Sequence, residues 1–179
     1  MRTVTECLGV WTWRLDFSSA VTSLNVYQRD VESSLAAFSK ITFYNHIMQH
    51  IPTNIQLRQR SKLLEIAFVS GESFVFPCEY LRVYSPSAEV RGHGGGQDVL
   101  QIGKEQVNII AIEPVGQYAV KLVFDDGHDS GLYSWDWLFE LGCEQHKKWR
   151  SYLARLHSEE GGGYQREPQE NDKYCEPVL

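Results

Sequence analysis

Three carboxylates and one imidazole lie within five consecutive residues, from Asp125 to Asp129. Imidazole nitrogen and carboxylate oxygen are ligands that iron and other divalent transition metals accept. One interpretation is therefore a metal site with His128 as the nitrogen ligand and Asp126 or Asp129 as the oxygen ligand. The alternative is structural, because Asp126-Gly127 has the composition of a tight hairpin turn and the histidine beside it can act as a hydrogen-bonding residue.

Other residues with reactive side chains give weaker signals. Cys78 and Cys143 have no adjacent cation that would lower the pKa of a thiol, and no paired histidine and asparagine accompany them. The glycine run at 94–96, which follows His93, lacks the lysine and hydroxyl residue of a phosphate-binding loop. We therefore predict no catalytic residue and no cofactor-binding loop, and we expect that the chain is not an enzyme.

A third group of residues suggests protein binding. Arginine and aromatic residues are the usual anchors of protein-binding surfaces. Arg82, Tyr80 and Trp135 form a candidate surface of this kind. Aromatic residues also build cores, so a core position remains the alternative for each of them.

The overall composition restricts the class of protein. The 179 residues include 17 Lys and Arg and 23 Asp and Glu, so the formal charge is −6, and 42% of the residues are hydrophobic. A negative balance argues against nucleic-acid binding. The chain holds no run of about 18 apolar residues, so no membrane span is predicted. Its cysteines, at positions 7, 78, 143 and 175, form no CxxC motif and favour reduced thiols in the cytoplasm.

The elements that position these residues follow from the apolar pattern. Alternating apolar residues over 64–68, 74–76, 107–111 and 118–124, separated by Gly- and Pro-containing turns, predict antiparallel hairpins. Ser134 is the expected N-cap of a short helix that Gly142 ends. A second helix carries an apolar stripe at 149, 152, 153 and 156. The prediction is an α+β fold of small antiparallel hairpins or sheets with two C-terminal helices.

The chain divides into three segments. Residues 1–47 show no sustained period, and either translation begins at Met48, which we favour, or the segment is a weakly ordered arm. Residues 48–157 form the predicted domain. Residues 158–179 contain two basic and six acidic residues with a glycine run, which predicts a disordered acidic tail.

Within the predicted domain, several separated motifs resemble those of one known family. They are FPCEYLR at 76–82, SPSAEV at 85–90, Gly92-His93, IEPVGQYAV at 112–120 and FDDGHDSGLYSW at 124–135. In this order they resemble the gamma-butyrobetaine hydroxylase-like N-terminal domain family, a domain of unknown function, over about residues 52–142. In full hydroxylases this domain precedes an iron-dependent oxygenase barrel. The 110 or so residues of the predicted domain are too few to hold both, so the oxygenase activity does not transfer.

The resemblance also implies a zinc site that this chain has lost. In the hydroxylases three cysteines and one histidine bind zinc, and the matching positions here are Ser85, Ser87, Val90 and His128. Serine is a poor zinc ligand and valine is none, so we predict that no stoichiometric zinc is bound. In the structural alternative the ring of His128 bridges its own turn to the loop around Ser85 and Ser87.

Two hypotheses about function follow. The first is a non-catalytic accessory or adaptor domain that binds a protein partner. The resemblance to family members fused to iron–sulfur carrier ATPases suggests such an ATPase as the partner and a link to iron–sulfur or iron handling. The second is a protein that binds iron or another divalent metal through His128 and the neighbouring carboxylates.

Overall fold

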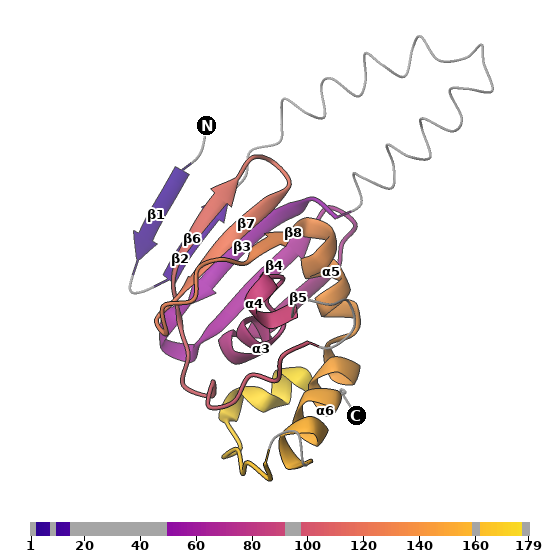
Figure 1. The fold of residues 1–179 in the computed structure, drawn as a ribbon. Coiled ribbons are helices and arrows are strands. Elements are labelled where there is room, and N and C mark those ends of the chain that lie inside the picture. The colour runs from indigo at the N-terminus through magenta and orange to yellow at the C-terminus, as the bar shows by residue number, and fades with distance from the viewer. Residues whose placement is uncertain (1–2, 8–9, 15–49, 92–97, 159–161, 177–179) are drawn as a thin grey trace, which may run out of the picture.

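The larger of two antiparallel sheets is built from consecutive strands. The computed structural model describes residues 3–7, 10–14, 50–91, 98–158 and 162–176. The strands of this sheet follow the order β1-β2-β3-β4-β5. Their bounds are β1 Thr3–Cys7, β2 Val10–Arg14, β3 Pro52–Arg58, β4 Leu63–Phe68 and β5 Ser73–Pro77 (Figure 1).

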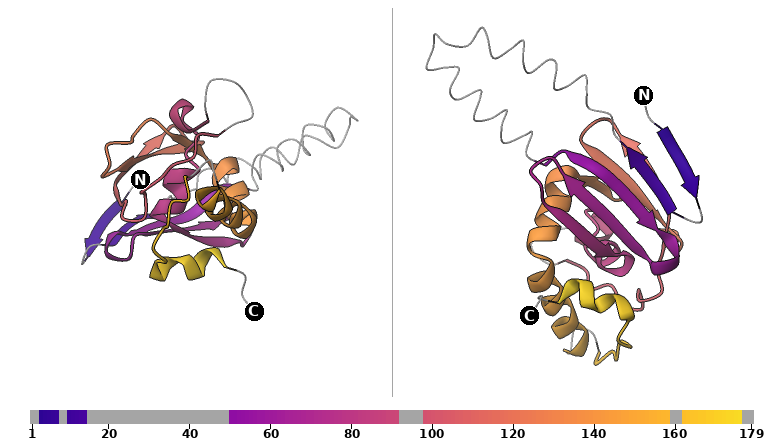
Figure 2. Two further views of the ribbon diagram at one scale, coloured as in Figure 1. Left: turned by 60° about the horizontal axis from the view of Figure 1, so that its bottom comes forward. Right: turned by 180° about the vertical axis from the view of Figure 1, so that it is seen from behind.

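The smaller sheet contains the histidine turn. Its strands are β6 Ile109–Val115, β7 Ala119–Phe124 and β8 Leu132–Ser134, in that order. The two sheets lie one over the other, as Figures 1 and 2 show. Buried side chains alternate with more exposed ones along β7, because one face of the strand points into the core.

Short helices complete the fold. They are η1 Gln59–Ser61, α3 Cys78–Val83, α4 Ala88–Arg91, α5 Trp135–Cys143, α6 Gln145–His157 and η2 Glu170–Cys175. The side chain of Ser134 accepts a hydrogen bond from the backbone N–H of Trp137, which confirms the predicted N-cap of α5. The fold is therefore α+β with two C-terminal helices, as predicted.

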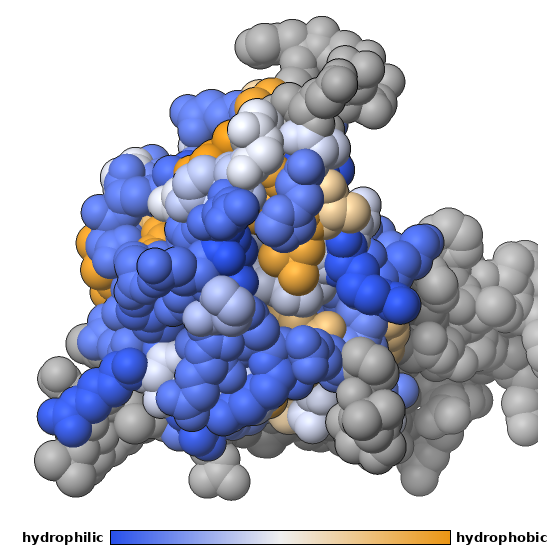
Figure 3. All heavy atoms as spheres, turned by 90° about the horizontal axis from the view of Figure 1, so that it is seen from below, coloured by the Kyte–Doolittle hydropathy of each residue, from blue (hydrophilic) through white to orange (hydrophobic). Residues whose placement is uncertain are grey.

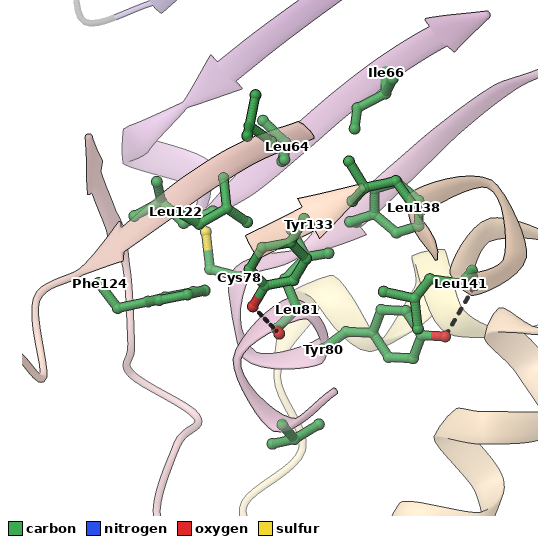
Figure 4. Close-up of a cluster of buried hydrophobic side chains, with 14 of the residues drawn as sticks. Leu64, Ile66, Cys78, Tyr80, Leu81, Leu122, Phe124, Tyr133, Leu138 and Leu141 are labelled. Carbon is green, nitrogen blue, oxygen red and sulfur yellow. Dashed lines mark hydrogen bonds between the residues drawn. The ribbon is translucent and has the colours of Figure 1, made fainter. Parts of the chain in front are cut away.

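The core lies between the sheets and against the helices. Leu64 and Ile66 from β4 lie near Leu122 from β7 in one buried cluster (Figure 4). The hydroxyl of Tyr133 donates to the backbone oxygen of Leu81 at 2.7 Å. Buried tyrosine hydroxyls need such partners, because an unsatisfied donor in the core is costly.

Two segment predictions need correction. Residues 3–7 and 10–14 form a hairpin whose second strand pairs with β3, so these parts of the N-terminal extension are strands; residues 15–47 lie outside the described residues. At the other end, residues 162–176, here called the C-terminal strap, pack on the domain and are not a disordered tail. Amino-acid composition does not indicate this packing, because it depends on one buried ion-pair cluster that holds the strap.

Candidate functional site

The turn that carries His128 is fixed by its backbone. The N–H of Gly127 donates to the carbonyl of Phe124 at 3.2 Å, and the N–H of Phe124 donates to the carbonyl of His128 at 2.9 Å. Gly127 has a φ of +84°, a conformation that glycine adopts without strain. The sequence Asp126-Gly127 thus forms the tight turn that it predicts.

The ring of His128 bridges this turn to the segment between α3 and α4. His128 is 5% exposed, its Nε2 lies 2.8 Å from Oγ of Ser85, and its Nδ1 lies 3.2 Å from Oε2 of Glu89. Because a carboxylate only accepts, the neutral ring donates from Nδ1 to Glu89 and accepts the Ser85 hydroxyl proton at Nε2. Burial, together with the nearby Arg82, lowers the pKa of His128 below its ordinary value and favours this neutral form. The predicted bridge to Ser85 is confirmed.

The positions that match zinc ligands in the hydroxylases lie together but do not suit zinc. Ser85, Ser87 and Val90 are all buried. Oγ of Ser87 has no hydrogen-bond partner among the described residues, as expected where a ligand has been replaced by a group without a matching partner. One imidazole, two hydroxyls and an isopropyl group lack the thiolates of a tetrahedral zinc site. The residues present therefore do not fit the metal that the resemblance implies.

The carboxylates of the turn face cations. Oδ2 of Asp126 accepts from Nε of Arg82 at 2.9 Å and from Nζ of Lys104 at 2.7 Å. Burial opposes the charge on Asp126, but these hydrogen bonds and charges outweigh it and lower its pKa. The Asp129 side chain is 60% exposed and lies 3.8 Å from Nζ of Lys121. The structure thus does not bring His128, Asp126 and Asp129 to one point, and the described residues hold no group of three or more metal-ligating side chains.

The predicted interaction residues are buried, so they are core residues and the predicted surface is wrong. Tyr80 is 0%, Arg82 7% and Trp135 8% exposed. The hydroxyl of Tyr80 donates to the carbonyl of Leu141 at 2.9 Å, and Nε1 of Trp135 donates to the carbonyl of Gln117 at 2.7 Å. Their types fit an interface, but these polar atoms, like Nε and Nη1 of Arg82, form hydrogen bonds inside the domain.

The buried thiols are unreactive. Burial raises the pKa of Cys78 and of Cys175 to about 12. Cys143 is exposed, and burial with nearby carboxylates raises its pKa as well. Thiolate formation is therefore disfavoured at Cys78, Cys143 and Cys175.

An ion-pair cluster that the sequence did not reveal joins the strap to the domain. The guanidinium of Arg166 contacts both oxygens of Glu79 and both oxygens of Asp172. It also lies 4.9 Å from the ring centroid of Trp149. The only hint in the sequence is a single arginine among acidic residues, which by itself predicts nothing.

The face of the smaller sheet that points away from the core is a second feature that the sequence did not single out. The register pairs Ala111 with Val123 and places Lys121 between Glu113 and Leu132. Val123 and Val115 are partly exposed, and Leu132 is 48% exposed. We call these residues (Ala111, Glu113, Val115, Lys121, Val123 and Leu132) the outer face.

Comparison with known proteins agrees with the motifs. A model of the family "Gamma-butyrobetaine hydroxylase-like, N-terminal" matches residues 55–139. A crystal structure of a protein of unknown function from the DUF971 family of Acidithiobacillus ferrooxidans is 32% identical; the match covers 53% of this chain and 96% of that one, with a TM-score of 0.44. The chain belongs to the gamma-butyrobetaine hydroxylase-like N-terminal domain family.

Two solution structures are also similar to this chain. One is 54% identical over 65% of this chain and 85% of that chain, with a TM-score of 0.56. The other is 50% identical over 69% of this chain and 94% of that chain, with a TM-score of 0.57. No curated protein matches the chain. The described helices include none that is long and apolar enough to cross a membrane. In this chain, the site around His128 is a junction of hydrogen bonds between two segments.

Proposed function

We propose that this chain is a non-catalytic accessory domain that binds a protein partner through the outer face. The observation that carries the proposal is the contrast between the two sheets. The partly or fully exposed residues of β3 and β4 are mostly polar, as Asn54, Gln56, Arg58 and Glu65 are, with Ala67 as an apolar exception. The corresponding positions of the smaller sheet are largely aliphatic.

An aliphatic face that no described helix covers exposes apolar surface to water, and burial of that surface against a partner is favourable. Figure 1 shows no helix in front of β6 and β7, while α5 and α6 lie to one side. The ion pair between Lys121 and Glu113, at 2.8 Å, crosses the aliphatic face. Such a charged pair within an apolar patch contributes more to specificity than to affinity.

The chemistry of the site near His128 supports a binding role over a catalytic one. The imidazole is already engaged on both nitrogens, and the buried thiols have raised pKa values. We propose an iron–sulfur carrier ATPase as the first partner to test, by analogy with fused relatives. We further propose a cytoplasmic location, because Cys78, Cys143 and Cys175 are free thiols.

The test compares two lysine substitutions in the affinity-tagged full chain. Leu132→Lys places a charge on the outer face, and Val69→Lys places the same charge at a 58% exposed position on the turn after β4. We expect the wild type and Val69→Lys to recover the same partners from native lysate. The amount of each partner recovered should be about tenfold lower with Leu132→Lys, as for a hot-spot residue. The readout is quantitative mass spectrometry. In a second experiment the purified ATPase replaces the lysate, and its binding to the tagged chains is measured directly.

Equal enrichment by both variants would contradict the proposal. Elemental analysis of the same preparations tests the metal-binding alternative. One iron or zinc per chain that survives dialysis would favour that alternative, whereas the proposal expects neither metal in stoichiometric amount.

A further inference from the structure

The C-terminal strap lies in a polar groove of the domain. Its floor and walls come from the end of η1, the first turn of α3, the segment before β6 and helix α6. We call it the strap groove, and its residues are Ser61, Lys62, Glu79, Glu105, Gln106, Trp149 and Tyr152. Figure 2 shows η2 running across this end of the molecule, next to α6.

The centre of the groove is a receptor for a guanidinium group. Nε and Nη2 of Arg166 donate to the two oxygens of Glu79 at 2.7 and 2.6 Å, a bidentate arrangement. The ring of Trp149 stacks on the guanidinium, and the hydroxyl of Tyr152 donates to Oε1 of Glu79 at 3.3 Å. A planar fork that is stacked on an aromatic ring fits arginine and does not fit lysine.

The carboxylate of this receptor depends on its occupant. The Glu79 side chain is 5% exposed, and burial raises its pKa even though the guanidinium contacts both oxygens. Burial also opposes the charge on Arg166, but the hydrogen bonds to Glu79 and Asp172 outweigh it and raise its pKa. An empty receptor would hold a desolvated carboxylate beside Glu105, so the groove favours any ligand that supplies a guanidinium.

The strap adds little apolar packing to this contact. Of its residues 162–176, Cys175 alone is fully buried. Tyr164 packs partly buried against the core, and the further contacts include hydrogen bonds from Asn171 Nδ2 to the carbonyl of Ser61 at 2.6 Å and from Gln106 Nε2 to Gln169 at 3.1 Å. The face of the molecule seen from below is largely hydrophilic, with apolar side chains in separate groups (Figure 3). A segment held by polar contacts opens locally at lower cost than the core.

The strap does not fill the whole groove. A cavity of about 300 Å³ remains between η2 and the η1 turn, and Glu79 and Asp172 both line it. Three basic residues, Arg58, Arg60 and Lys62, line the other side. Acidic residues of the strap, Glu170 and Asp172, face the same cavity, so the groove and its occupant are complementary in charge.

We propose that the strap groove is a docking site for a peptide segment of a partner protein in which an arginine is followed by acidic residues. Residues 162–176 occupy it as an intramolecular ligand that such a partner displaces. This surface is separate from the outer face, so either can fail without the other. A tethered occupant competes at a high effective concentration, which keeps the groove closed to weak ligands.

The test uses the full chain and a fluorescently labelled peptide with the sequence of residues 162–176. Arg166→Ala in the chain empties the receptor. Lys173→Ala removes a strap charge whose printed contacts, with Glu170 and the ring of Tyr174, lie within the strap, and it serves as the matched control. By anisotropy we expect Arg166→Ala to bind the peptide about tenfold or more tightly than the wild type or Lys173→Ala does. A second peptide carries Arg166→Lys. This lysine peptide should bind the Arg166→Ala chain at least about tenfold more weakly than the unchanged peptide does.

A folded Arg166→Ala chain that binds the peptide no better than the wild type would overturn the proposal, as would equal binding of the lysine peptide. If that variant does not fold, amide hydrogen exchange of the wild type decides. Strap amides that exchange well before those of α5 support a displaceable occupant, and strap amides that exchange only on global unfolding overturn it. A wild-type dimer that exchanges straps between copies would also overturn it, because the groove would then serve self-association.

Discussion

In the folded chain the ring of His128 forms two hydrogen bonds in place of those it would form with water, one with the hydroxyl of Ser85 and one with the carboxylate of Glu89. Ser85 is 1% exposed, so it has no access to water if the imidazole is removed. The close approach is tight on the other side as well, since a Cβ on Gly131 would lie 2.3 Å from the Ser85 oxygen. A larger side chain at 131 is therefore excluded. Together with the ion pair between Arg82 and Asp126, the junction holds the turn against α3 and the segment that follows it.

The substitution His128→Ala should lower the melting temperature by several degrees. Leaving the buried hydroxyl of Ser85 without its partner costs about 1–3 kcal/mol. A small domain loses about 4–8 °C for each kcal/mol. Thermal melts with and without added iron(II) measure the effect, and Asp129→Ala, at a 60% exposed side chain, is the control. An iron-dependent rise of the wild type that vanishes in His128→Ala would show that the histidine is a ligand.

The same histidine should make stability depend on pH. Burial and the charge on Arg82 lower its pKa, whereas Glu89 and Asp126 act in the opposite direction. A lowered folded-state pKa means that the unfolded chain binds the proton first, so stability is fully present above the ordinary value of about 6.5 and falls as the pH decreases toward the folded-state pKa. Urea melts from about pH 7.5 to about pH 5.5 should show a larger loss for the wild type than for His128→Gln. Equal losses would indicate that His128 remains neutral in both states or has no shifted pKa.

Single residues show where sequence reasoning succeeded and where it could not. The turn at Asp126-Gly127 and the His128 bridge follow from local composition and from the aligned loop around Ser85. Tyr80 and Arg82 were misjudged, because residue type does not reveal that all six residues of the short helix α3 are buried. The strap could not be predicted, since Arg166 and Glu79 are 87 positions apart and composition does not report such pairs.

At the scale of elements, helix α5 illustrates how packing moves a boundary. Ser134 begins the helix as its sequence predicts, but Gly142 does not end it, because α5 continues to Cys143 and Glu144 is the C-cap residue. Gly142 is needed for a different reason. A Cβ at this position would lie 2.4 Å from the Cγ atom of Phe74, so the glycine allows α5 to approach β5.

The substitution Gly142→Ala should therefore destabilise the domain. Alanine in a helix gains about 1 kcal/mol over glycine, but forcing a methyl group into a packed contact costs about 1–3 kcal/mol. We expect a net loss of roughly 1 kcal/mol in urea melts. In a Phe74→Ala background the clashing Cγ and Cδ atoms are absent, and Gly142→Ala should become neutral or stabilising there relative to Phe74→Ala alone. A loss of the same size in both backgrounds would indicate that Phe74 is not the obstacle.

At the scale of the whole molecule, the described core residues run from Ile55 to Cys175. They link the inner faces of both sheets with α3, α5 and α6 in one cluster, so these parts are expected to unfold together, whereas the strap contributes only Cys175 to the buried residues of that cluster. The N-terminal hairpin is attached differently, by ladder pairing of β2 with β3 at the edge of the larger sheet. The apolar pattern predicts the hairpins of the core, because burial on one face imposes strict alternation. It does not predict β1 and β2, because their alternation extends over too few residues.

A chain that begins at Met48 should therefore fold cooperatively and melt within about 4 °C of the full chain, a difference of about 1 kcal/mol or less. Removal of β2 leaves β3 as an edge strand, but the described core cluster keeps its residues. A 50% identical relative, of which 94% is matched by 69% of this chain, adopts a related fold in solution. Parallel thermal melts by circular dichroism measure the difference. A larger loss, or a broad transition in the shortened chain, would show that β1 and β2 are integral to the domain, and aggregation that grows with concentration would indicate that the hairpin protects the edge of β3.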